Sequence, residues 1–306
     1  MSLPSNAPAI RLDGLGKHYG RVAALEHVSF DVHPGEIFGF LGLNGAGKTT
    51  TIRILLDLVR ATSGRAFVFG KDCHSDSLAV RREIGYLPGE LGFRGEMTGE
   101  ATLDFLGRLH SRGVDEAWRR DLLNRLELVA RDLSRRVREY STGMKRKLGI
   151  VQAFQSDAPL LILDEPTDGL DPLMQEAVYD LLAEVKRRGR TVFMSSHVLP
   201  EVERVCDRIG LLRNGALTLV STVDEVRRMA ARRVRVTFGG DVAMPAAWPA
   251  GWEVLDVSPR AWTVRVEGPM GPLVAMVAPL GVHDIEVHEP HLEEVLKRYY
   301  TDERRA

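Results

Sequence analysis

The stretch "GFLGLNGAGKTTTIRIL", which begins at Gly39, constrains the fold of this chain more than any other. It places four glycines and a lysine within ten residues. The run "EIFGFLG" at residues 36–42 is short, apolar and rich in large side chains, which is typical of a buried strand. The run "KTTTIRILLDLV" at residues 48–59 spaces its apolar residues three and four apart, as an amphipathic helix does. The sequence therefore predicts a strand, a glycine loop and a helix in that order.

Residues 42–49, "GLNGAGKT", match the phosphate-binding loop pattern in the strand-to-helix setting that gives the pattern its mechanism. Glycines let the backbone curl so that successive N–H groups point at phosphate oxygens, and the next helix adds its positive dipole. Lys48 is expected to reach the β- and γ-phosphates, and the Thr49 hydroxyl to bind Mg²⁺. We predict a nucleoside triphosphate that contacts the whole loop, namely Gly42, Leu43, Asn44, Gly45, Ala46, Gly47, Lys48, Thr49 and Thr50.

A second motif, "APLLILDEPTDGLDP" at residues 158–172, indicates which reaction the bound nucleotide undergoes. An apolar strand runs directly into Asp164 and Glu165, and ligands bind at the carboxyl ends of strands in a parallel sheet. Asp164 suits a Mg²⁺ ion held through its water shell, and Glu165 can polarise a water molecule in line with the γ-phosphate. The pair therefore predicts a hydrolase, whereas without the phosphate loop it would be interpreted as the acidic cap of a strand.

The composition argues against several other classes of protein. The 306 residues carry 41 basic and 42 acidic side chains, and this net charge of -1 gives no bulk attraction to nucleic acid, so we predict no nucleic-acid partner. Cys73 and Cys206 lack metal-type spacing, so we expect buried, reduced thiols in a cytosolic protein. No secretory signal fits, and "GPMGPLVAMVAPLGV" is too short to span a membrane, which takes about 20 apolar residues. Any membrane-spanning partner is therefore expected to be another chain.

With these motifs, the chain resembles the ATP-binding subunit of an ABC (ATP-binding cassette) transporter over about residues 9–222. The resemblance implies an α/β fold: a P-loop ABC ATPase with a RecA-like core, an antiparallel β subdomain and a helical subdomain at about residues 90–156. It also implies that Tyr19, in "KHYG", lies against adenine. A half-buried tyrosine at a strand end would otherwise be the default interpretation.

The stretch "YSTGMKRKLGI", residues 140–150, stands where the signature of that family lies. The resemblance implies that this loop closes over the γ-phosphate bound by the other subunit, so that two chains enclose two ATP molecules. The signature loop comprises Ser141, Thr142, Gly143 and Met144. By itself the stretch would be interpreted as an ordinary helix cap, and its basic run "MKRKLG" as a solvated helix face.

Two further positions match functional residues of the family. Asp171, in "DGLD", matches the aspartate of the loop that runs across the dimer interface. His197 ends the strand-like run "TVFMSSH" and matches the histidine that contacts the γ-phosphate and orients Glu165 and water. A lone histidine after a strand would otherwise be interpreted as a surface residue. The catalytic residues that the resemblance implies are therefore Glu165, His197 and Lys48.

The chain departs from the family pattern in its signature and in one loop. Thr142 and Met144 replace a usual glycine and glutamine, and Gly89 replaces the glutamine that touches Mg²⁺ and relays nucleotide state. We hypothesise that Glu90, the nearest side chain able to approach a cation, takes the metal-side role. A solvated loop glutamate is an equal alternative. The predicted metal ligands are then Thr49, Asp164 and Glu90.

After about Val220 the charge and the spacing of apolar residues along the chain change. The basic stretch "VDEVRRMAARRVRV" is interpreted as a solvated helix face, with contact to anionic lipid as the alternative. Beyond it, "RVRVTFGG", "WEVLDVS" and "AWTVRVEG" alternate like strands, "GPLVAMVAPLG" predicts a short helix, "VHDIEVHEP" a strand and "HLEEVLKRYY" a helix. We therefore predict an ABC ATPase domain at residues 1–222 and a small α+β accessory domain at residues 223–306, whose ending resembles that of drug- and antibiotic-export ATPases.

Together these interpretations predict an ATP-binding and ATP-hydrolysing subunit of an exporter. Its cofactors would be ATP and Mg²⁺. Its partners would be a second copy of itself and a separate transmembrane permease, which would hold it peripherally at the cytoplasmic face of the cell membrane. The alternative is a soluble ABC-type ATPase that remodels a cytosolic complex. One phosphate loop and no internal repeat favour the first function.

Overall fold

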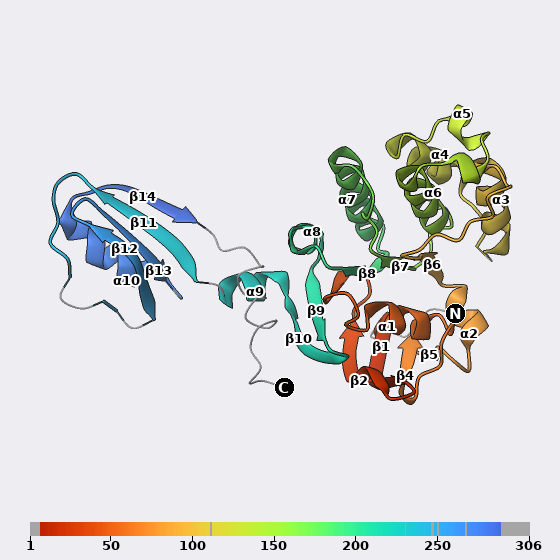
Figure 1. Cartoon of the computed structure of the whole chain (residues 1–306), viewed down its shortest axis with the longest axis horizontal. Coiled ribbons are helices and arrows are strands. Elements are labelled where there is room, and N and C mark those ends of the chain that lie inside the picture. Colours follow the sequence, from red (N-terminus) through yellow and green to blue (C-terminus); the bar gives the residue numbers. More distant parts are fainter. Residues whose placement is uncertain are drawn as a thin grey trace. The chain divides into compact units, whose positions relative to one another are not determined.

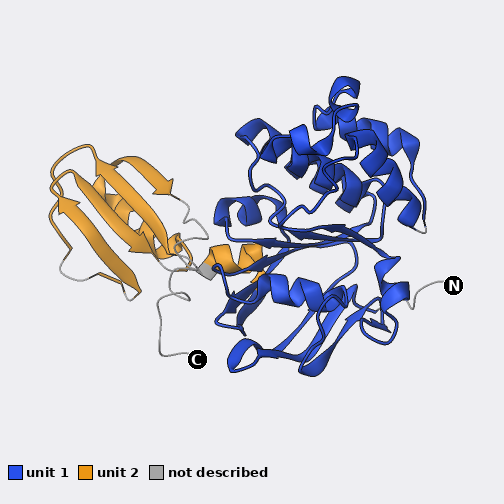
Figure 2. Ribbon diagram, turned by 45° about the vertical axis from the view of Figure 1, so that its right-hand side comes forward, with its two compact units in different colours: residues 1–220 blue, residues 221–306 orange. Residues whose placement is uncertain are grey.

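The computed structural model describes residues 7–110, 112–229, 231–245, 248–249, 251–266 and 268–288. Two compact units make up the chain, residues 1–220 and residues 221–306 (Figure 2). The helix predicted from "HLEEVLKRYY" lies outside the described residues. Within the described part of the chain, no helix has both the length and the apolar character needed to cross a membrane.

A six-stranded sheet forms the centre of the first unit, in the order β10-β9-β3-β8-β7-β6. β3 pairs in parallel with β8 and β9, and β7 pairs in parallel with β6 and β8. β3 (Ile37–Leu41) and β7 (Leu160–Asp164) are buried along their whole length, as central strands of a covered parallel sheet are. The other strands are β6 (Ile84–Leu87), β8 (Thr191–Ser196), β9 (Arg208–Arg213) and β10 (Ala216–Thr222).

An antiparallel sheet in the order β2-β1-β4-β5 and helix α1 lie on one side of the parallel sheet (Figures 1 and 2). α1 (Lys48–Leu55) ends earlier than the predicted pattern because Asp57 takes the left-handed conformation, with φ of 52°. The short helix α2 (Ser77–Arg81) precedes β6. The strands are β1 (Ile10–Tyr19), β2 (Val22–Val32), β4 (Ser63–Val68) and β5 (Lys71–Asp72).

Helices cover the other side of the parallel sheet (Figure 1). The run at residues 115–133 forms two helices, α4 and α5, because Glu127 between them has φ of 53°. Trp118 of α4 is buried, and its Nε1 donates to the Phe154 carbonyl oxygen at 3.0 Å, so this side chain belongs to the packed interior of the helical layer. The helices are α3 (Gly99–Leu109), α4 (Glu116–Arg125), α5 (Ala130–Leu133), the 3-10 turn η1 (Val137–Glu139), α6 (Thr142–Phe154), α7 (Pro172–Arg187) and α8 (Leu199–Val205).

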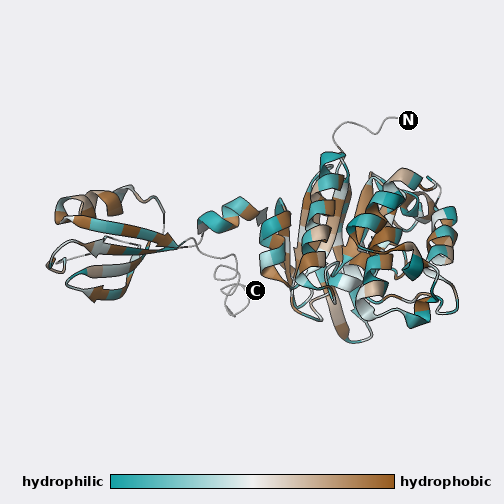
Figure 3. Ribbon diagram, turned by 90° about the horizontal axis from the view of Figure 1, so that it is seen from above, coloured by the Kyte–Doolittle hydropathy of each residue, from teal (hydrophilic) through white to brown (hydrophobic). Residues whose placement is uncertain are grey.

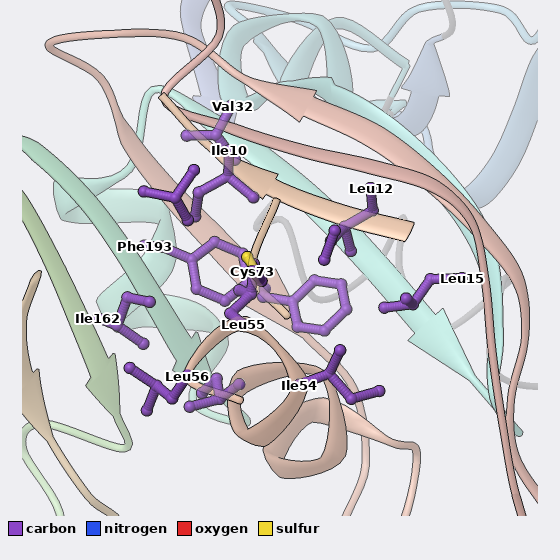
Figure 4. Packing of buried hydrophobic residues seen from close by; sticks show 14 of the residues in the cluster. Ile10, Leu12, Leu15, Val32, Ile54, Leu55, Leu56, Cys73, Ile162 and Phe193 are labelled. Carbon is purple, nitrogen blue, oxygen red and sulfur yellow. The ribbon is translucent and has the colours of Figure 1, made fainter. Parts of the chain in front are cut away.

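The core of this unit lies between the two sheets. The rings of Phe30 and Phe38 stack with centroids 5.1 Å apart, and Phe193 stacks on Phe38 at 5.9 Å. Figure 4 shows Leu55, Cys73 and Phe193 in the same cluster, and Figure 3 shows hydrophobic residues along the strands. Both cysteines are buried and free, and burial raises the pKa of Cys73 to about 12. Burying each large apolar side chain contributes about 1.5–3 kcal/mol.

The second unit contains a four-stranded antiparallel sheet in the order β12-β13-β11-β14. Its core contains Val236, Phe238, Trp262 and Leu273, and Leu273 belongs to a short helix. β12, β13, β14 and the short helix lie within the segments that the sequence predicts for them. β11 begins one residue before its predicted run, so the basic stretch at residues 223–236 is a helix only over its first half and a strand from Arg232 on. The elements are α9 (Val223–Met229), β11 (Arg232–Phe238), β12 (Trp252–Ser258), β13 (Ala261–Val266), α10 (Gly271–Val277), the 3-10 turn η2 (Ala278–Leu280) and β14 (Val282–His288).

Candidate active site

The glycine loop after β3 turns tightly into α1. Gly45 and Gly47 have φ of 81° and 112°, in the region that favours glycine. A Cβ at Gly47 would lie 2.5 Å from the Ala24 carbonyl oxygen, and one at Gly42 would lie 2.6 Å from the Leu212 carbonyl oxygen. The loop therefore needs glycine both for its conformation and for the close approach of β2 and β9. This arrangement aims the free N–H groups of the α1 N-terminus at the loop.

The first turn of α1 faces the end of β7. Lys48 is 6% exposed, and its Nζ donates to the Gly42 carbonyl oxygen at 2.6 Å and lies 3.4 Å from Oε1 of Glu165. The Thr49 hydroxyl donates to Oδ2 of Asp164 at 3.1 Å. A buried cation and two carboxylates therefore meet at the mouth of the loop, which is the chemistry that an anionic ligand with a divalent cation requires.

Parallel pairing of β7 and β8 brings the remaining polar groups together. Asp164 is in register with Ser195, whose hydroxyl donates to Oδ1 of Asp164. The N–H of Glu165 donates to the Ser195 carbonyl oxygen at 3.2 Å, and Glu165 has φ of 54°. Such a conformation in a non-glycine residue costs on the order of 1–3 kcal/mol and is characteristic of functional sites. Nδ1 of His197 lies 2.5 Å from Oε2 of Glu165.

These groups surround one cavity of about 550 Å³. Gly42 and Ala46 of the predicted loop do not line it. They support the loop instead, since Gly42 holds Lys48 and Ala46 is buried. The cavity is lined by Ala24, Leu43, Asn44, Gly45, Gly47, Lys48, Thr49, Thr50, Gly89, Arg146, Asp164, Glu165, Asp168 and His197. The structure therefore brings together the phosphate loop, the acidic pair and the histidine that the sequence singled out.

Tyr19 and Glu90 of the predicted site also lie outside the lining of this cavity. Tyr19 ends β1, is 45% exposed and lies under Nζ of Lys17, which is 4.9 Å from its ring centroid. Glu90 is exposed and is absent from the lining, so the geometry gives its metal-side role no support. Gly89 lies closer to the acidic pair, because a Cβ there would be 3.2 Å from Oδ2 of Asp164.

Ser141 of the signature loop and Asp171 each cap a helix in this chain. Oγ of Ser141 accepts the N–H of Met144 at 3.2 Å at the start of α6. Oδ1 of Asp171 accepts the N–H of Met174 at 3.0 Å at the start of α7. Neither cap lines the cavity of its own chain.

The prediction of a solvated face for "MKRKLG" is wrong at Arg146, which is 4% exposed. Its guanidinium donates to three carbonyl oxygens, those of Pro88, Gly89 and Asp168. Burial lowers the pKa of Arg146, and the nearby carboxylates oppose that effect. Helical spacing could have predicted the burial of Arg146, because it places residue 146 on the buried stripe formed by residues 149, 150 and 153.

A buried carboxyl group behind the cavity was also missed. Glu201, in the first turn of α8, accepts hydrogen bonds from the hydroxyl groups of Thr167 at 2.8 Å and Ser196 at 2.7 Å. Thr167 follows Glu165 by two residues, and Ser196 directly precedes His197. Glu201 therefore ties together the two segments that carry the acidic pair and the histidine.

The donor set at the end of β7 fits Mg²⁺. In the described part of the chain, no group of three or more His, Cys, Asp or Glu side chains could hold a metal ion by itself. Thr49 and Asp164 supply two oxygen donors, and Mg²⁺ usually takes one or two protein ligands with substrate phosphates and water. The site therefore fits an ion that arrives with a nucleotide.

Comparison with known families matches residues 25–168 to the family described as ABC transporter. The chain is 34% identical, over 97% of its length and 98% of the relative's, to the daunorubicin resistance ATP-binding protein DrrA3 of Streptomyces coeruleorubidus. It is 36% identical, over 72% of its length and 71% of the relative's, to the bacitracin transport ATP-binding protein BcrA of Bacillus licheniformis. It is 38% identical over 67% of its length to an uncharacterized ABC transporter ATP-binding protein of Synechocystis sp. (strain ATCC 27184 / PCC 6803 / Kazusa), but spans only 58% of that relative.

Two solved structures share the architecture of the first unit. One is described as the ATP-binding subunit of an ABC transporter; the match has a TM-score of 0.67 at 34% identity and covers 72% of this chain and 92% of that one. The other is a dimeric ATP-binding cassette in a post-hydrolysis state with ADP and Pi. That match has a TM-score of 0.64 at 22% identity, covers 70% of this chain and 98% of that one, and concerns the fold alone.

Proposed function

Since this chain belongs to the ABC transporter family, as an ATP-binding subunit that hydrolyses ATP for transport, we propose that it works with Mg²⁺ in a homodimer and drives export through a separate membrane permease. Its fold is that of an ABC ATPase with an additional C-terminal antiparallel sheet, which confirms the predicted fold class. We assign residues 1–222 to the ATPase domain and residues 223–306 to an accessory domain.

One observation carries the proposed mechanism: Lys48, Glu165 and His197 face the same cavity. Glu165 accepts the proton of the water that attacks the γ-phosphate, and His197, 2.5 Å away, orients that carboxylate. Lys48 offsets the charge on the phosphoryl oxygens. Thr49 and Asp164 would hold Mg²⁺, which would supply positive charge beside the phosphate oxygens.

The proposed homodimer gives a role to the residues that lie outside their own cavity. The signature loop, residues 141–144, contacts the γ-phosphate bound by the second copy, and the segment at Asp171 crosses the interface. The signature segment begins α6, and the N–H groups of a helix N-terminus suit an anion. We assign the exposed ring of Tyr19 to the adenine base and residues 42–50 to the phosphates.

Export is supported by the relatives' names. One is a daunorubicin resistance protein and another a bacitracin transport protein, and both are ATP-binding proteins. We propose that this chain likewise serves the removal of a compound from the cell and lies peripherally at the cytoplasmic face of the membrane through its permease.

Substitution of the proposed water-activating residue tests the mechanism. Glu165→Gln is expected to bind ATP, to hydrolyse it about 100-fold or more slowly than wild type, and to accumulate an ATP-bound dimer. Lys48→Ala is the companion variant and should lose both nucleotide binding and turnover. Phosphate release and light scattering after size exclusion measure these outcomes. A Glu165→Gln rate equal to wild type would show that another group activates the water.

The partner is tested with the same variant. Tagged Glu165→Gln, expressed in its native host and purified with ATP from detergent-solubilised membranes, should carry a near-stoichiometric, strongly apolar chain that mass spectrometry identifies. Recovery only from the soluble fraction with ribosomal or assembly-complex partners would replace the transport proposal by the remodelling one. The ATPase assignment would be unaffected.

A further inference from the structure

The guanidinium group of Arg146 lies where three segments of the first unit meet. Its Nη1 donates to the Pro88 carbonyl oxygen at 3.0 Å, its Nη2 to the Gly89 carbonyl oxygen at 3.1 Å, and its Nε to the Asp168 carbonyl oxygen at 3.2 Å. Nη2 also lies 3.7 Å from Oδ2 of Asp168. A side chain that is 4% exposed therefore has donors engaged on two separate loops.

Each of these loops leads to the hydrolysis site. Gly89 follows β6 and lies against the carboxyl group of Asp164, and Asp168 follows Glu165 by three residues. Gly89, Arg146 and Asp168 all line the cavity that contains the acidic pair. Arg146 itself belongs to α6, the helix that begins at the signature loop. The side chain thus joins the signature helix to both loops that border the acidic pair.

The rest of α6 is held by close packing. A Cβ at Gly85 would lie 2.1 Å from the Ala153 carbonyl oxygen, so β6 and the C-terminal half of α6 are in direct contact. At the other end, a Cβ at Gly143 would lie 3.3 Å from the Gly169 carbonyl oxygen, so the signature turn approaches the loop after Glu165. Arg146 and this contact are therefore links between the N-terminal half of α6 and the borders of the site.

We infer that Arg146 is a positioning residue that couples the signature helix to the hydrolysis site of its own chain. The inference rests on the proposed function, in which the signature loop responds to the nucleotide of a second copy. Because Gly89 has no side chain, this residue can be held only through its backbone groups and packing, and its carbonyl oxygen accepts from Arg146. Guanidinium is planar and presents five N–H donors in a rigid fork, so it can serve three carbonyl oxygens at once. A lysine ammonium is a point charge on a flexible stem and cannot reproduce that geometry.

Arg146→Met and Arg146→Lys test the inference, with Lys147→Met as the matched control on the same helix. Three quantities are measured on the full chain: the affinity for a fluorescent ADP analogue, kcat and KM for ATP, and ATP-dependent dimer formation in the Glu165→Gln background. Arg146→Met is expected to keep the affinity within about twofold, to lower kcat about tenfold or more, and to weaken dimer formation. Arg146→Lys is expected to restore neither kcat nor the dimer.

The outcomes separate this inference from the proposed function. Wild-type kcat and dimer formation in folded Arg146→Met, or restored kcat in Arg146→Lys, would overturn the inference alone. A fall in ADP-analogue affinity that parallels the fall in kcat would also overturn it, since Arg146 would then contact the nucleotide directly. If Arg146→Met does not fold, Arg146→Lys decides by the same criteria. A wild-type chain that neither hydrolyses ATP nor dimerises would overturn the proposed function, and this inference with it.

Discussion

The carboxyl group of Glu201 is 3% exposed and accepts hydrogen bonds from the hydroxyl groups of Thr167 and Ser196. Burial raises its pKa above the ordinary 4.5, and the charge of Glu165 adds to this rise, whereas the two hydroxyl donors and His197 oppose it. The folded chain therefore binds a proton at Glu201 more tightly than the unfolded chain does. The stability that this proton contributes is fully present below pH 4.5 and is lost as the pH rises through the folded-state pKa.

Glu201→Gln is expected to remove this pH dependence, because the amide has no charge to bury. The difference in unfolding free energy, variant minus wild type, should therefore become more positive as the pH rises from 4.5 toward neutrality. Urea unfolding at a series of pH values without nucleotide measures it. Glu90→Gln, at an exposed position, is the control and should run parallel to wild type. A Glu201→Gln curve that is also parallel to wild type would contradict the prediction.

At the scale of elements, α6 and β6 approach most closely where both carry glycine. A Cβ at Gly85 would lie 2.1 Å from the Ala153 carbonyl oxygen, and one at Gly149 would lie 2.8 Å from Cδ1 of Leu87. Neither glycine has a positive φ. Space, and not backbone conformation, is therefore what requires glycine in this contact, and the contact sets the place of α6 beside the acidic pair.

Gly85→Ala should lower the free energy of unfolding by about 1–3 kcal/mol, because the added methyl group forces the helix away from the sheet. Chemical denaturation followed by circular dichroism measures the loss. Gly92→Ala is the control, since a Cβ there would meet no atom within 4 Å. Equal stability of the two variants would mean that the interface relaxes without cost.

At the scale of the whole molecule, each compact unit has its own hydrophobic core. In the second unit, Trp262 is 1% exposed and packs edge-on against Phe238 at 4.6 Å and Trp248 at 5.2 Å. The indole N–H of Trp262 has no hydrogen-bond partner among the residues that the structure describes. Its stabilising contribution is therefore apolar packing.

Trp262→Ala should destabilise the second unit by about 3–5 kcal/mol and leave nucleotide affinity, a property of the first unit, unchanged. Trp262→Phe should cost less, because it keeps an aromatic ring and removes the unpaired N–H. Fluorescence of the remaining tryptophans during urea unfolding, together with binding of a fluorescent ADP analogue, measures both effects. Loss of nucleotide binding in parallel with the loss of the second unit would contradict the assignment of the two domains.

Prediction from the sequence succeeded where the signal is local. The phosphate loop was readable because glycine spacing, Lys48 and the flanking strand and helix are adjacent in the chain, and Asp164 and Glu165 because they end an apolar strand. It failed at Arg146, whose acceptors on Pro88 and Gly89 lie more than 50 residues away, and it missed Glu201 because both of its partners belong to other segments. The end of α1 was missed because the apolar spacing of residues 48–59 continues past it.

The sequence by itself determined the family, the fold class and the chemistry of the phosphate loop and acidic pair, since each depends on residue types at short, fixed spacing. Only the tertiary structure decided that Arg146 is buried between two loops and that neither Tyr19 nor Glu90 lines the cavity. These are matters of strand register and helix packing, which bring distant segments within hydrogen-bond distance and which no local pattern specifies.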